Sequence, residues 1–201
     1  MFFSIVLTYL PYSLVTAFTP GPNNIVALHA VSQNGWSKGR HVLLGIAAGF
    51  LCVMVFCALF CYELAKYVPA LSGLLKYVGA AYIVWLAVHV ARSTYEENGG
   101  RHMSFWEGVF LEFANFKIIL YSITVYTGYV LPYGGDLASL LFHAVCITSI
   151  GMAGVMTWAC AGRIFQRFLS RHFRLFNLAM ALILVCCAVT LALSTASPNT
   201  L

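Results

Sequence analysis

VLLGIAAGFLCVMVFCALFCY, residues 42–62, decides the fold class of this chain. The stretch contains no Lys, Arg, Asp or Glu, and a helix needs about 20 apolar residues to cross the hydrocarbon core of a bilayer. A helix on the surface of a soluble protein has one polar face, and this stretch has no charged residue to form one. The sequence therefore predicts a transmembrane helix at these residues.

The rest of the chain has the same character. Hydrophobic residues make up 61% of the 201 residues and charged residues 8%, against roughly 25% charged in a soluble domain. Charged side chains are absent from residues 1–37, 42–62, 77–91, 118–135, 137–162 and 175–201. We predict about six transmembrane helices and no separate soluble domain. Their approximate bounds are 2–31, 42–63, 70–91, 106–131, 137–162 and 175–195.

The expected fold is an all-α integral membrane protein, a single transmembrane domain over 1–201. Only helices and closed barrels satisfy their backbone in lipid, and no stretch alternates as a barrel strand does. Residues 1–17 lack a basic n-region, so we expect a retained first span rather than a signal peptide. The polar interval 92–104 divides the chain into halves of about 1–95 and 104–201. With three spans in each half, related halves would have inverted topology.

The net charge of +5 follows from where the basic residues lie. The first, third and fifth predicted loops hold most of them, and only Lys66 and Lys76 lie on the opposite side. Basic loops stay in the cytoplasm, so both termini are predicted to be periplasmic. Topology accounts for the positive charge, and we expect no nucleic-acid partner. The loop residues are Lys38, Arg40, Arg92, Arg101, Arg163, Arg167, Arg171 and Arg174.

Motifs for metal, cofactor or catalytic sites are missing from the sequence. The seven cysteines all fall in apolar stretches, and their odd number without a Cys-x-x-Cys pair predicts neither disulfides nor a metal site. No P-loop, Gly-x-Ser-x-Gly or His-Glu-x-x-His motif occurs. We therefore expect no cofactor and no enzymatic activity.

The first predicted span contains Pro20-Gly21-Pro22-Asn23-Asn24. A proline in a helix interior costs about 3 kcal/mol, so this run should interrupt the helix. An interrupted span is tolerated in lipid only where protein or a water-filled cavity surrounds it. Asn23 and Asn24 would then begin a half-helix whose free N–H groups favour a carboxylate. The alternative is a packing kink or an interfacial turn without a ligand.

Asn115-Phe116-Lys117 interrupts the predicted fourth span, the corresponding position of the second half. Lys117 is the only basic residue well inside a predicted span, and a charge there costs about 3 kcal/mol unless it is paired or hydrated. It should therefore have a partner or bind substrate. The alternative is that Lys117 snorkels to the cytoplasmic surface. Interrupted spans in matching positions predict a binding site near the membrane midplane.

Four further residues are candidates for the lining of a cavity: His29, Tyr82, Tyr121 and Trp158. Aromatic belts and helix packing use the same residue types, so packing is the alternative for each. Gly45-x-x-x-Gly49 predicts a close contact between two helices.

Three segments resemble the LysE/RhtB family of bacterial amino-acid exporters: Pro20-Gly21-Pro22-Asn23-Asn24, Gly79-Ala80-Ala81-Tyr82-Ile83-Val84-Trp85-Leu86-Ala87 and Asn115-Phe116-Lys117. Ser104-Phe105-Trp106 and Lys117-Ile118-Ile119-Leu120-Tyr121 most resemble the members that export cysteine and O-acetylserine. The resemblance implies efflux of small amino acids across the bacterial inner membrane, driven by the proton gradient. Many members have proline where this chain has Phe116.

Three functions are weighed at this point, in decreasing order of support. The first is a secondary exporter, an antiporter of amino acids and protons, with one site formed by residues 20–24 and 115–117. The second is a non-transporting, membrane-embedded binding or assembly subunit, and an intramembrane enzyme comes third. The preferred amino acid and the residue that carries the proton are left open by the sequence. The oligomeric state is left open too, and a homo-oligomer is one of the alternatives.

Overall fold

The structure is a computed structural model that describes residues 2–67, 69–92, 104–133 and 136–193. Nearly all of these residues are helical, and none of them lies in a β-strand. The predicted all-α fold is therefore confirmed. The polar interval that was expected to separate the two halves lies almost entirely outside the described residues.

The first predicted span is bent, as expected from its prolines. Helix α1 covers Phe2–Phe18 and α2 begins at Pro22 and ends at Tyr67. The axes of Phe3–Phe18 and Pro22–Ser32 differ by 50°. A second change of direction occurs in α2 at Gly35, where φ is 74° and ψ is 166°. A glycine suits this position because a side chain would be strained at positive φ.

The fourth predicted span is also bent. Helix α4 covers Phe105–Ala114, α5 covers Phe116–Val125, and a π-helical turn η1 (Tyr126–Val130) and a 3₁₀ turn η2 (Leu131–Tyr133) follow. The two parts meet at 61° on either side of Asn115. A capping box between Ser104 and Glu107 fixes the start of α4.

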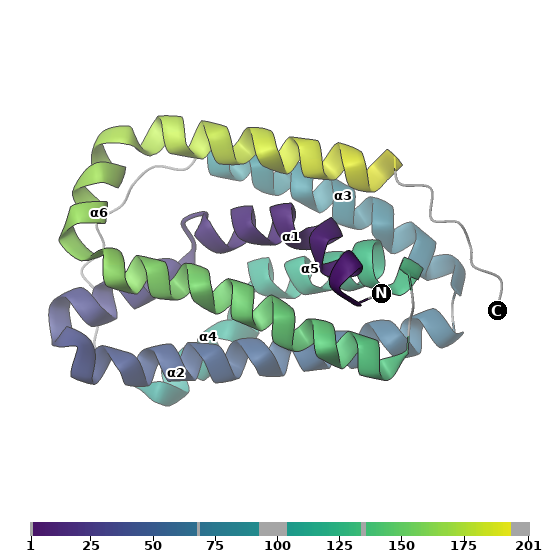
Figure 1. Cartoon of the computed structure of the whole chain (residues 1–201), viewed down its shortest axis with the longest axis horizontal. Helices are drawn as coiled ribbons and strands as arrows, with labels where there is room; N and C mark the ends of the chain where they lie inside the picture. The colour runs from purple at the N-terminus through teal and green to yellow at the C-terminus, as the bar shows by residue number, and fades with distance from the viewer. Residues whose placement is uncertain (1, 68, 93–103, 134–135, 194–201) are drawn as a thin grey trace.

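The remaining helices are α3 (Pro69–Arg92) and α6 (Leu137–Leu193). Figure 1 shows that α6 runs along the molecule and then reverses direction. Its apolar limbs are Leu137–Ala161 and Asn177–Leu193. The start of α1 and the end of α6 lie toward one end of the bundle, whereas α2 and α6 both change direction at the other end (Figure 1).

Two described helices are long and apolar enough to cross a membrane, Gly35–Lys66 and Leu137–Ala161, and each bent pair adds one more if it counts as a span. Within the described residues, Tyr77–Arg92 and Asn177–Leu193 are apolar but shorter. The structure thus supports two to four spans, and the count of six stays a prediction. The surface of the bundle is apolar, with exposed side chains such as Leu7, Phe56 and Leu182. Apolar surface of this extent is unusual for a soluble protein.

The predicted contact at Gly45 and Gly49 joins α2 to α4. A Cβ on Gly45 would clash with the backbone of Phe105, and one on Gly49 would lie 2.7 Å from the carbonyl oxygen of Val109. On the α4 side, a Cβ on Gly108 would lie 2.8 Å from the carbonyl oxygen of Val42. The glycines therefore let the two backbones touch, and this contact sets the position of α4.

We expect Gly45→Val to destabilise the protein, because the new side chain meets rigid backbone rather than a movable side chain. Overpacking of this kind costs about 1–3 kcal/mol. Ala81→Val is the control, since it adds similar volume at an exposed helical position. Thermal unfolding in detergent should show a lower midpoint for Gly45→Val than for the control. Equal midpoints would contradict the close contact.

Candidate functional site

The first helix break lies at Thr19, Pro20 and Gly21 and is shorter than the predicted stretch of residues 20–24. Helix α2 already begins at Pro22, which suits a first helical position because proline has no N–H to leave unpaired. Asn23 and Asn24 therefore lie in the first turn of α2. The backbone N–H groups of a first turn have no partner within the helix, so this end is positively polarised.

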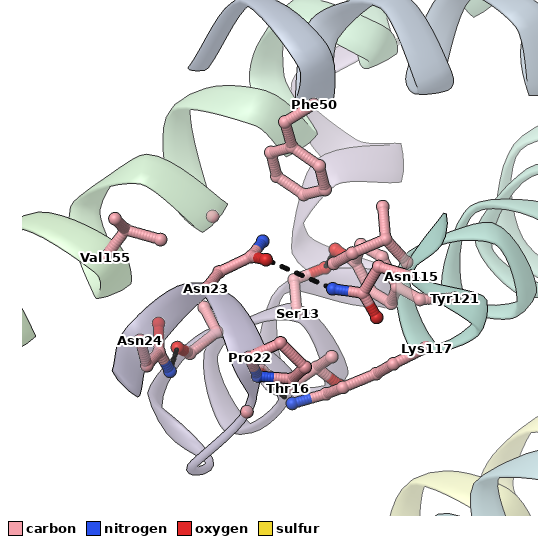
Figure 2. Close-up of a pocket in the computed structure, with 14 residues that line it drawn as sticks. Ser13, Thr16, Pro22, Asn23, Asn24, Phe50, Asn115, Lys117, Tyr121 and Val155 are labelled. Atoms are coloured by element: carbon pink, nitrogen blue, oxygen red, sulfur yellow. Dashed lines mark hydrogen bonds between the residues drawn. The ribbon is translucent and has the colours of Figure 1, made fainter. Parts of the chain in front are cut away.

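The Lys117 ammonium lies on the other side of the break, at the last carbonyls of α1. Its Nζ donates to the carbonyl oxygens of Thr16 (3.1 Å) and Thr19 (3.4 Å). These carbonyls lie at the negatively polarised end of the helix, which is favourable for a cation. Lys117 thus has hydrogen-bond partners at the end of α1, and Figure 2 shows its side chain extending toward Thr16 beside Pro22.

Two more side chains hold the end of α1. Asn24 Nδ2 donates to the carbonyl oxygens of Ala17 (2.8 Å) and Thr19 (2.9 Å). Trp158 Nε1, from α6, donates to the carbonyl oxygen of Phe18 (3.2 Å). The α6 backbone can approach closely because Gly154 has no Cβ, which would lie 2.6 Å from the Ala17 oxygen. The side-chain N–H groups of Asn24 are therefore already hydrogen-bonded to backbone carbonyls at the helix break.

The second break is at Asn115, whose φ of −88° and ψ of 90° are extended rather than helical. Asn115 ends α4 and begins α5, and it does so without a proline after it. Its Nδ2 donates to Oδ1 of Asn23 (3.1 Å). Figure 2 shows this hydrogen bond between the two interrupted helices, with Lys117 beside it. The structure thus brings together the residues that the sequence singled out in the two halves.

Two cavities meet at this point. One has a volume of about 510 Å³, which is within the range of about 300–1,000 Å³ found for small-molecule sites. The other has a volume of about 30 Å³, room for about one water molecule. Four residues line both cavities: Gly21, Pro22, Asn115 and Lys117. The two helix breaks therefore separate a wide space from a narrow one.

The four candidate lining residues have different places. His29 and Trp158 line the larger cavity, and Tyr121 lines the smaller one. Tyr121 also donates a hydrogen bond to Oγ of Ser13 (2.7 Å). Tyr82 lies outside both walls, and its hydroxyl donates to the backbone carbonyl of Lys117 (3.1 Å). Its role in this structure is to hold the second break rather than to line a cavity.

The structure adds His89 and Glu112 to the candidate site residues. Trp85 and His89 stack on each other with ring centroids 5.2 Å apart and line the larger cavity. Because they are four residues apart, they lie on one face of the helix. This spacing is the feature of the sequence that could have identified them as a pair. Glu112 is fully buried in α4. Its position as an acidic residue inside a predicted span could have marked it as functional.

The chemistry of the site includes groups that favour opposite charges. The positive end of α2 and the Lys117 ammonium can bind an anionic group, and the carbonyls at the end of α1 can bind a cationic one. The amides of Asn23 and Asn115 supply neutral donors and acceptors. No group of three or more His, Cys, Asp or Glu residues that could hold a metal occurs among the described residues.

Comparison with known proteins agrees with this geometry. The family model for LysE type translocators matches residues 14–195. The chain belongs to the LysE family. A cysteine/O-acetylserine efflux protein of Escherichia coli (strain K12) is 44% identical over 180 residues, which cover 89% of this chain and 92% of the relative. Proteins of the same name from Escherichia coli O9:H4 (strain HS) and Shigella flexneri match to the same extent.

Membership of the LysE family confirms the resemblance found in the sequence and makes the chain an integral membrane translocator. The apolar surface of the bundle is accordingly the surface that contacts lipid. The LysE relatives are named as efflux proteins and not as enzymes, in agreement with the expected lack of enzymatic activity. No solved structure matches the chain.

Proposed function

We propose that this LysE family member is a secondary exporter of small amino acids or their derivatives, cysteine and O-acetylserine foremost, across the bacterial inner membrane. Protons moving inward drive the export. The observation that carries the proposal is the meeting of the two helix breaks: Asn23 and Asn115 are hydrogen-bonded across them, and Lys117 lies at the wall between two cavities. Secondary transporters bind substrate at interrupted helices of this kind.

The charges at the breaks favour a free amino acid over other small molecules. The carboxylate would lie between Lys117 and the first turn of α2. The ammonium would lie at the carbonyls of Thr16 and Thr19, which now accept from Lys117. Substrate would thus replace contacts that the protein makes with itself. The side chain of the amino acid would extend into the larger cavity, where Trp85 and Trp158 form part of the wall.

The proposed topology has six spans in two inverted halves, 1–95 and 104–201, with both termini in the periplasm. One bend of similar size in each half, 50° and 61°, supports related halves. The start of α1 and the end of α6 lie toward the same end of the bundle (Figure 1). This arrangement supports an even number of membrane crossings. The bend of α2 near Gly35 and the end of α3 lie toward the opposite end of the bundle (Figure 1). Lys38, Arg40 and Arg92 belong to these segments, and the positive-inside rule assigns their end to the cytoplasm.

The test is counterflow of labelled cysteine and O-acetylserine in proteoliposomes that contain only this chain. We expect labelled substrate to enter vesicles preloaded with the same unlabelled substrate and not to enter protein-free vesicles. Unlabelled cysteine outside should compete. A chain that shows no counterflow of any amino acid, while being folded by circular dichroism, would contradict the proposal and favour a non-transporting membrane subunit.

A further inference from the structure

Glu112 is the one acidic side chain that is fully buried among the residues described by the structure. Its relative exposure is 0%, and neither carboxyl oxygen has a hydrogen-bond partner. An ionised carboxylate without partners is very costly in an apolar interior, so such groups remain neutral. The carboxyl of Glu112 is therefore protonated in this conformation.

The surroundings of Glu112 are built to fit a neutral side chain. Its Cγ lies 2.9 Å from the place where a Cβ on Gly49 would be, so α2 leaves room for the side chain only by having a glycine there. The amide of Asn23 faces the carboxyl, but no hydrogen bond between them closes in this conformation. The Asn23 oxygen meanwhile accepts from Asn115.

No described ionisable group is placed to pair with the carboxyl. On α4 itself, Glu107 is held in the capping box, and on α5 the Lys117 ammonium lies on the carbonyls of α1. The charged and imidazole groups on the neighbouring part of α2 are exposed, and its thiols range from exposed to buried. These α2 residues are Lys38, Arg40, His41, Cys52, Cys57, Cys61 and Glu63.

Glu112 is also connected to the candidate substrate site. Its backbone carbonyl accepts the N–H of Asn115 (3.2 Å), the residue at which the helix breaks. Its neighbours Leu111 and Ala114 already line the larger cavity. A change of the bend at Asn115 would therefore turn the carboxyl toward or away from the cavity. Binding of substrate to Asn115 and the exposure of Glu112 to water would be linked.

We propose that Glu112 binds the proton that is exchanged for substrate; this rests on the proposed export function. The carboxylate takes up one proton when it is accessible from the outer side. It carries that proton in the buried, neutral state and releases it to the inner side as substrate binds. No bond other than O–H is made or broken, and one proton moves inward in each cycle. The carboxyl can stay buried without a counter-ion only while it holds this proton.

The test compares Glu112→Gln with the wild type in two proteoliposome assays. Counterflow of cysteine needs no net proton movement, whereas accumulation driven by a pH gradient does. We expect Glu112→Gln to lose gradient-driven accumulation by at least tenfold, together with substrate-dependent proton flux, and to lose less of the counterflow, which moves no net proton. Gradient-driven accumulation that persists in Glu112→Gln would overturn the proposal.

Glu107→Gln is the matched control, because glutamine also serves in a capping box, and it should retain both activities. If the wild type itself shows no counterflow, the proposed function fails rather than the assignment of Glu112. The two outcomes are therefore distinguishable.

A second measurement uses the wild type alone and decides the matter if Glu112→Gln is inactive in both assays. Dicyclohexylcarbodiimide modifies protonated carboxyl groups in apolar surroundings. Mass-spectrometric mapping should find Glu112 modified and Glu107 unmodified, with parallel loss of gradient-driven transport and less modification when cysteine is present. An unmodified Glu112, or modification that leaves gradient-driven transport intact, would overturn the proposal.

Discussion

Replacing Lys117 by methionine is expected to abolish transport. The ammonium is the positive side chain at the meeting point of the two breaks, and its two hydrogen bonds hold the end of α1. A hydrogen bond to a charged group contributes about 1.5–3 kcal/mol. Loss of one such bond to the substrate carboxylate corresponds to about 10- to 150-fold weaker binding. Counterflow of cysteine should fall at least by this factor.

The binding role of Lys117 can be separated from its structural role by changing the substrate. Cysteamine has the thiol and the ammonium of cysteine but no carboxylate. The wild type should prefer cysteine to cysteamine, and Lys117→Met should lose that preference in competition binding. Lys38→Met, at an exposed position, is the control and should keep it. An unchanged preference in folded Lys117→Met would show that the carboxylate binds elsewhere.

Local chemistry made the first helix break predictable and the second one less so. Pro20, Gly21 and Pro22 are incompatible with a continuous helix whatever surrounds them. Asn115 has no such intrinsic effect, and the helix ends there although the next residue is Phe116 rather than a proline. The break at Asn115 is maintained by its tertiary contacts, including the hydrogen bond to Asn23. Only the resemblance to a family and the polar residues pointed to it.

The sequence alone could not predict which groups contact one another between different helices. An intramembrane lysine predicted a partner, but the partner is the backbone at the end of α1, and carbonyl groups have no sequence signature. The same holds for Glu112, whose burial depends on a glycine in another helix. Helix length and composition predict spans, yet the bent and merged helices leave their number between two and four among the described residues.

The larger cavity and a cluster of tyrosines lie on different sides of the helix breaks. The cavity is lined by His29, which lies between the start of α2 and its bend at Gly35, and by His89, three residues before the end of α3 at Arg92. On the other side of the breaks, Tyr12 packs on Tyr121 and Tyr129, with ring centroids 5.3 and 6.2 Å apart. Tyr12 and Tyr126 are fully buried there. The conformation is thus wide on the side of the basic loops and packed with tyrosines on the other.

In the proposed topology the basic loops face the cytoplasm, from which an exporter takes up its substrate, so a cavity open toward these loops is the expected state before loading. In a variant without native cysteines, His89→Cys should react with a membrane-impermeant maleimide applied from the cytoplasmic side of inverted vesicles, and O-acetylserine, which has no thiol to consume the reagent, should slow the reaction. Tyr126→Cys should remain unlabelled from either side, because its position has no exposed surface. A pathway lined by the tyrosines would open only after substrate binds.

A different labelling pattern at the two introduced cysteines would also be informative. Protection at His89→Cys without labelling at Tyr126→Cys would place the basic loops in the periplasm, whereas protection at His89→Cys with labelling at Tyr126→Cys would mean that the resting protein opens outward. Labelling of His89→Cys in right-side-out cells, where only the periplasmic side is reached, separates these two explanations. It would occur only if the basic loops face the periplasm, and the inferred direction of transport through the larger cavity would then have to be inverted.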